Sequence, residues 1–152
     1  MKPRKIDQFL EHHPKIGLDT CILIYWAESN EKYGELVGPI FAWLERRGRA
    51  VTSTITMLVL LVHPYRTNDI DRVNQFYSLF STFPNLDWLE PTLDLADRAA
   101  HLRGQLHLRT PDALQAATAL DAQATGFISN DDAFKRVSDL DVLILDEVLA
   151  DR

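Results

Sequence analysis

Short apolar runs bounded by polar residues recur along the chain, and they predict five buried strands. The clearest run is Val142-Leu143-Ile144-Leu145, which follows the polar residue Asp141. A run of this length is typical of a strand that is covered on both faces of a parallel sheet. The predicted strands cover residues 16–18, 49–54, 86–89, 127–129 and 142–145.

Longer segments between these runs have apolar residues at helical spacing. Segment 55–62 is apolar nearly all round, so we expect a buried helix that ends at His63-Pro64. Thr110-Pro111-Asp112 places a hydroxyl, a proline and an acid where the start of a helix favours them. We expect His12 and His13 to lie in solvent. The predicted helices cover residues 20–26, 31–48, 55–62, 69–83, 93–108, 110–124 and 133–137, and residues 1–14 form a short helix or arm.

Strands that alternate with helices predict an α/β fold of three layers, with a central parallel sheet of about five strands flanked by helices. The chain of 152 residues has no internal repeat and no linker long enough to divide it. We therefore expect residues 1–152 to form a single domain.

Composition narrows the class of protein. The net charge of −6 argues against a broad basic surface for duplex DNA, although a metal ion in an acidic site would supply local positive charge. The single cysteine, Cys21, precludes an intramolecular disulfide and is expected to be a small buried hydrophobe. No segment approaches the roughly 18 apolar residues of a membrane span, so we expect no membrane association and a cytoplasmic location.

Three acids occupy comparable places in the predicted fold. Asp19 follows the first strand, Asp112 lies in the first turn of a helix, and Asp131 follows the fourth strand. In an open α/β sheet all three can gather at the carboxyl edge, where ligands bind. Each acid could instead serve only to cap its helix, and Asp132 could take the place of Asp131.

Clustered carboxylates are hard oxygen ligands that suit Mg²⁺ or Mn²⁺. The usual chemistry of such a site is hydrolysis of a phosphodiester. We therefore expect Asp19, Asp112 and Asp131 to be the metal-binding and catalytic residues.

Four motifs, in this order, resemble the PIN-domain family, and within it the prokaryotic VapC-type toxin ribonucleases. The motifs are Leu18-Asp19-Thr20 with Leu23-Ile24-Tyr25; Thr52-Ser53-Thr54-Ile55-Thr56; Thr110-Pro111-Asp112-Ala113-Leu114 with Ala116-Ala117-Thr118-Ala119; and Phe127-Ile128-Ser129-Asn130-Asp131. The resemblance implies a PIN-like fold and a Mg²⁺-dependent endoribonuclease with an RNA substrate. It also implies a small antitoxin partner and a homodimer.

One position departs from the family pattern. The family places a glutamate on the helix after the second strand, and Val59 stands at that position here. Valine cannot bind a metal or orient a water, so the resemblance implies an enzyme that is weakened or inactive. Glu28 could supply a carboxylate from the preceding helix.

Other functional assignments remain open. The chain could be a non-catalytic PIN-like module that binds RNA or a protein. A phospho-accepting α/β domain fits less well, because Cys21 occupies the place where a haloacid-dehalogenase-like phosphatase needs its second acid. Arg103 and Arg109 are the first candidates for phosphate contact, and the tryptophans lie in apolar stripes typical of a core.

Overall fold

The computed structural model describes residues 3–151 and contains one sheet of five parallel strands. All five predicted strands are present, with ends that shift by at most one residue. The order across the sheet is β3-β2-β1-β4-β5, so β1 lies at its centre. The strands are β1 (Lys15–Leu18), β2 (Arg49–Ser53), β3 (Leu86–Leu89), β4 (Gly126–Ser129) and β5 (Asp141–Ile144).

Helices connect the strands and cover both faces of the sheet. Helix α8 was not predicted. We expected Leu145 to end the fifth strand, whereas it begins α8. Asp146 and Glu147 fall in the first turn of α8, where a helix favours acids. No helix within residues 3–151 combines the length and the apolar character needed to cross a bilayer. The helices are α1 (Pro3–His12), α2 (Thr20–Ala27), α3 (Gly34–Arg46), α4 (Ile55–Arg66), α5 (Ile70–Phe80), α6 (Leu93–Leu106), α7 (Thr110–Asp121) and α8 (Leu145–Ala150), with a 3₁₀ helix η1 (Asp132–Arg136).

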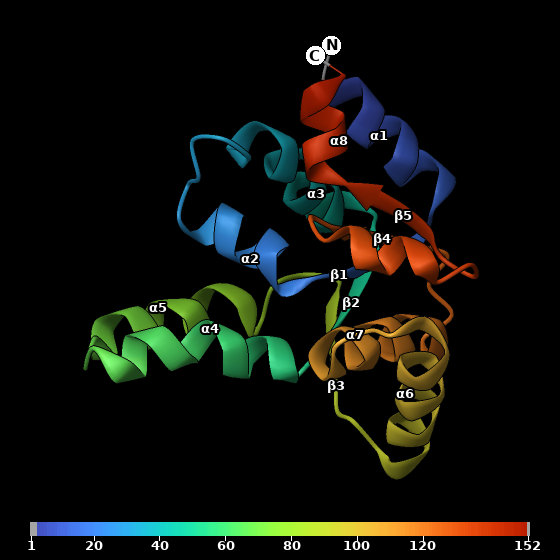
Figure 1. The fold of residues 1–152 in the computed structure, drawn as a ribbon. Coiled ribbons are helices and arrows are strands. Elements are labelled where there is room, and N and C mark those ends of the chain that lie inside the picture. The colour runs from blue at the N-terminus through green and yellow to red at the C-terminus, as the bar shows by residue number, and fades with distance from the viewer. Residues whose placement is uncertain (1–2, 152) are drawn as a thin grey trace.

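The three-layer α/β architecture is confirmed. Helices α1, α2, α3 and α8 pack with β1 in one hydrophobic cluster, whereas α6, α7 and η1 form a second cluster on the other face. Helices α4 and α5 pack against each other as a hairpin at one side of the sheet (Figure 1). Helices α1 and α8 lie next to each other, and Lys5 forms an ion pair with Asp151 there.

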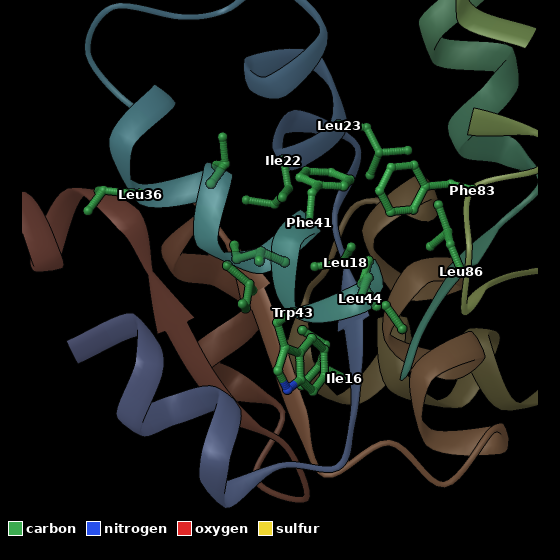
Figure 2. Packing of buried hydrophobic residues seen from close by; sticks show 14 of the residues in the cluster. Ile16, Leu18, Ile22, Leu23, Leu36, Phe41, Trp43, Leu44, Phe83 and Leu86 are labelled. Carbon is green, nitrogen blue, oxygen red and sulfur yellow. The ribbon is translucent and has the colours of Figure 1, made fainter. Parts of the chain in front are cut away.

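Trp43 belongs to the larger cluster, and Trp26 and Trp88 are partly buried and pack against it. Trp43 is 5% exposed, and Trp26 stacks on Phe41 with ring centroids 4.2 Å apart. Ile16 and Leu18 of β1 point into the same cluster (Figure 2). This packing holds the central strand, and therefore the residue that follows it, in a fixed place.

Two predictions about helix α4 are wrong. It continues through Pro64 to Arg66, and Pro64 is buried. Its apolar surface is also not buried all round: α4 contacts α2, α5 and β2, but several of its apolar residues remain exposed. Leu58, Val59 and Val62 are 63%, 44% and 41% exposed.

The prediction that His13 lies in solvent is wrong. The side chain is buried, with Nδ1 2.8 Å from Oγ1 of Thr125 and Nε2 2.7 Å from Oδ2 of Asp141. Its ring also packs on Phe9. His13 therefore joins the end of α1 to the beginnings of β4 and β5.

Candidate active site

Asp19 lies at the carboxyl end of the central strand β1 and caps α2. Its Oδ1 accepts a hydrogen bond of 2.8 Å from the backbone N–H of Thr20, and its Oδ2 accepts one of 2.6 Å from the hydroxyl of Ser129. Burial raises the pKa of Asp19, these two hydrogen bonds act in the opposite direction, and the charges of Asp112 and Asp131 add to the rise. The capping role is therefore real, but it leaves Asp19 close enough to the other two acids to be affected by them.

Asp112 lies in the first turn of α7 and is only 5% exposed. Helix α7 packs closely against β1 and β2 because its inward face is rich in small side chains, among them Ala116 and Ala119, which are fully buried. The Asp112 side chain accepts hydrogen bonds from Arg109 rather than from the free N–H groups of the helix start. Asp112 therefore keeps the favourable place of an acid in the first turn of a helix, but its side-chain hydrogen bonds go to Arg109.

Asp131 follows β4 and caps η1. Its Oδ1 accepts a hydrogen bond of 2.9 Å from the N–H of Ala133, and its own N–H donates to the hydroxyl of Ser129 at 3.0 Å. Ser129 thus bonds both to Asp19 and to the backbone of Asp131, which couples the ends of β1 and β4. Asp132, the alternative acid, is exposed and does not line the pocket described next.

The three acids line one pocket of about 400 Å³. They come from the end of β1, the start of α7 and the end of β4, so the parallel sheet brings together residues that are far apart in the sequence. A hollow of about 880 Å³ along α5 is larger, but it is lined only by residues of that helix and Ala27. The acidic pocket differs from this hollow because its three acids come from separate elements of the fold.

A buried polar network supports the floor of this pocket. The Gln115 amide accepts a hydrogen bond of 3.2 Å from the N–H of Ser53 and donates one of 2.5 Å to the hydroxyl of Thr56. The Thr56 hydroxyl also bonds to those of Thr20 and Thr52, at 3.2 and 2.7 Å. The network links α2, β2, α4 and α7, and it fixes the helix that carries Asp112.

Arg109 is the cationic residue of the pocket. Its Nε lies 2.9 Å from Oδ2 of Asp112, and its Nη2 lies 3.3 Å from Oδ1 of Asp112 and 3.5 Å from Oδ2 of Asp131. The hydrogen bond to Asp112, followed by the charge of Asp112, raises the pKa of Arg109. Of the two arginines suggested for phosphate contact, Arg109 lines the pocket, whereas Arg103 bonds to the hydroxyl of Thr110 outside it.

Val59 lines the same pocket from α4, where the family pattern places a glutamate. Glu28 does not line the acidic pocket; it lines a neighbouring pocket between α2, α4 and α5, which Val59 also lines. Cys21, expected to be a small buried hydrophobe, is half-buried: it packs against the larger hydrophobic cluster and also lines the acidic pocket. Burial raises the pKa of its thiol to about 12.

Sequence reasoning missed three other pocket residues. Gln115 lies one turn after Asp112, so their helical spacing could have indicated it. Asn130 adjoins Asp131, and its amide donates a hydrogen bond of 3.3 Å to the hydroxyl of Tyr25. Nothing in the sequence indicates that Tyr25, in an apolar run, reaches this pocket.

The donor chemistry of the pocket suits a hard divalent cation, but the present arrangement holds a guanidinium instead. Within residues 3–151, no three His, Cys, Asp or Glu side chains are grouped as a metal site would require. Arg109 occupies the oxygens of Asp112 and lies beside Asp131. Asp19, Asp112 and Asp131 fit a divalent cation in ligand type, but in this arrangement their carboxylates are not grouped around one cation position.

Comparisons with known proteins agree on the fold. The model of the PIN domain family matches residues 16–140. VapBC2 from Rickettsia felis, solved with a DNA fragment from its promoter, superposes with a TM-score of 0.66 at 17% identity, covering 86% of this chain and 98% of that chain. VapBC-1 from nontypeable Haemophilus influenzae superposes with a TM-score of 0.63 at 20% identity, covering 87% and 98%.

A toxin–antitoxin complex from Klebsiella pneumoniae superposes with a TM-score of 0.61 at 22% identity, covering 84% of this chain and 95% of that chain. At these identities the likeness establishes the shared fold. No curated protein matches the chain.

Proposed function

This chain belongs to the PIN domain family, and on that premise we propose that it is a divalent-metal-dependent endoribonuclease of the toxin–antitoxin type, weakened by Val59. One observation carries the proposal: Asp19, Asp112 and Asp131 come from three separate elements and line one pocket. The substrate is RNA, and the action is cytoplasmic.

Each acid has a role in this proposal. Asp19, Asp112 and Asp131 would hold Mg²⁺ or Mn²⁺, which supplies counter-charge for the phosphate and lowers the pKa of a water molecule. Ser129 orients Asp19, and the network around Gln115 holds Asp112 in place. Arg109 contacts the RNA phosphate, because a guanidinium matches phosphate oxygens in pairs.

The α4–α5 hairpin supports the proposal of protein partners. It exposes several large apolar side chains that a lone chain leaves in water, and such a surface favours association. We propose a small antitoxin and a second copy of the chain as the partners. The exposed residues are Leu58, Val59, Val62, Tyr65, Ile70 and Tyr77.

The second candidate function is a PIN-like module that binds RNA or a protein without cleaving it. Two features of the pocket favour it. Val59 replaces a carboxylate at the rim, and Arg109 neutralises Asp112 and approaches Asp131. Both features reduce the negative charge available to a divalent cation.

Val59→Glu separates the two functions, and Val62→Glu is its matched control. Both valines are exposed on α4, but only Val59 lines the acidic pocket. We expect Val59→Glu to increase Mn²⁺-dependent RNA cleavage by about 10–100-fold, the usual effect of a partner to metal ligands. We expect Val62→Glu to leave cleavage unchanged, and EDTA to abolish the gain.

Metal binding is measured alongside cleavage. If Val59→Glu neither cleaves RNA nor binds Mn²⁺, the nuclease proposal is wrong and the binding module is favoured. A crystal soaked in Mn²⁺ tests the ligands directly, because the proposal places the metal density among Asp19, Asp112 and Asp131.

A further inference from the structure

Arg109 forms a bidentate ion pair with Asp112. The Nε and Nη2 groups contact different oxygens of that carboxylate, at 2.9 and 3.3 Å, so the guanidinium covers both of them. Nη2 also lies 3.5 Å from Oδ2 of Asp131. Arg109 therefore interacts with two of the three acids that line the pocket.

The burial of Asp112 explains why a cation lies there. The Asp112 side chain is 7% exposed, and a buried carboxylate needs a compensating charge or it becomes very costly. Among the described residues, Arg109 is the one cationic side chain that is ion-paired with Asp112. The fold thus meets the electrostatic need of this acid without a metal ion.

The Arg109 side chain is nevertheless free to leave. It is 75% exposed, and within residues 3–151 its hydrogen bonds and ion pairs all go to Asp112 and Asp131. Its backbone lies just before α7, in an extended conformation, so the side chain can turn outward without disturbing the helix. Because the Arg109 side chain is exposed, its reorientation costs little free energy, whereas the buried Asp112 side chain stays in place.

We infer that Arg109 is a built-in counter-ion that competes with the divalent cation for Asp112 and Asp131 and turns to the RNA phosphate once it is displaced. This inference rests on the proposed function. A guanidinium and a divalent cation cannot share the same two oxygens without strong repulsion, so each weakens the binding of the other. The released guanidinium lies at the mouth of the pocket, where an RNA phosphate would approach.

The first test measures Mn²⁺ affinity by calorimetry rather than activity. We expect Arg109→Met to bind Mn²⁺ more tightly than the parent, by about fivefold or more, the low end of typical couplings between linked binding events. Arg103→Met is the matched control, because it removes an exposed arginine that bonds to Thr110 and does not line the pocket. We expect this control to bind Mn²⁺ like the parent.

Arg109→Lys keeps the positive charge but loses the planar guanidinium that contacts both oxygens of Asp112. We therefore expect its Mn²⁺ affinity to lie between those of the parent and Arg109→Met. It also keeps the test decisive if Arg109→Met does not fold. If Arg109→Met and Arg109→Lys bind Mn²⁺ no more tightly than the parent, the competition is refuted while the nuclease proposal stands. If the parent, Arg109→Met and Val59→Glu all fail to bind Mn²⁺, both proposals are refuted.

A second test examines whether Arg109, once Mn²⁺ has displaced it from the two acids, binds RNA. The probe is a short 2′-O-methyl RNA, which cannot be cleaved. With saturating Mn²⁺ we expect the parent to bind this RNA more tightly than Arg109→Met. In EDTA, with Arg109 held by the two acids, we expect a smaller difference in affinity between the parent and Arg109→Met. Equal affinities in Mn²⁺ would refute the phosphate-binding half of the inference.

Discussion

Gly17 lies in β1, where the central strand packs closely against β4 and α7. A methyl group at this position would lie 2.5 Å from Cδ2 of Phe127 and 2.8 Å from Cβ of Ala119. Neither neighbour can move easily. Phe127 is fully buried and packs on Phe134 at a centroid distance of 4.5 Å, and Ala119 belongs to the body of α7.

We therefore expect Gly17→Ala to destabilise the protein. Forcing an extra methyl group into a filled core costs about 1–3 kcal/mol. For a chain of this size, 2 kcal/mol corresponds to a decrease of about 4–8 °C in Tm. Because α7 also carries Asp112, an outward shift of this helix should weaken Mn²⁺ binding as well.

Thermal unfolding followed by circular dichroism measures the effect, and Gly104→Ala is the matched control. Gly104 lies in the exposed part of α6, where an added methyl group meets nothing within 4 Å. Alanine is the better helix former, so this control should stabilise the protein by roughly 0.5–1 kcal/mol. A Gly17→Ala protein as stable as the parent would refute the close packing of α7 on the central strand.

Further predictions concern Cys21 in the acidic pocket and His13 at the beginnings of β4 and β5. The pKa of about 12 for the Cys21 thiol lies three units above its ordinary value of 9.0. Because only the thiolate reacts, we expect alkylation of Cys21 at pH 8 to be about 1,000-fold slower in the folded protein than in denaturant. Equal alkylation rates, measured by mass spectrometry, would contradict this. Because the folded protein keeps the Cys21 thiol neutral, the free energy of unfolding should be constant below pH 9 and should fall as the pH rises from 9 towards 12. Cys21→Ala should remove this fall. His13→Ala removes the hydrogen bonds to Thr125 and Asp141 and should cost about 1–3 kcal/mol in urea unfolding. Asp141→Asn should cost less than about 1 kcal/mol because this acid is exposed, and an equal cost for both would contradict the anchoring role of His13.

Much of the fold could be predicted from sequence because strands and helix starts are local features. The apolar run at 142–145 predicts a strand from its own composition, and Thr110-Pro111-Asp112 predicts a helix start from its own chemistry. The burial of α4 could not be predicted in this way. Its apolar residues would suit a buried helix, but only the neighbouring helices decide which side is covered, and Leu58 and Val62 remain exposed.

Sequence alone determined which side chains could form a site: three acids at the ends of elements, and a valine where the family has a glutamate. Only the tertiary structure decided what surrounds them. Strand order brings Asp19 and Asp131 next to each other, and the packing of α7 brings Asp112 to the same pocket. The partnership of Arg109 with Asp112 and Asp131, and the place of Glu28 in another pocket, depend on through-space distances that no local pattern encodes.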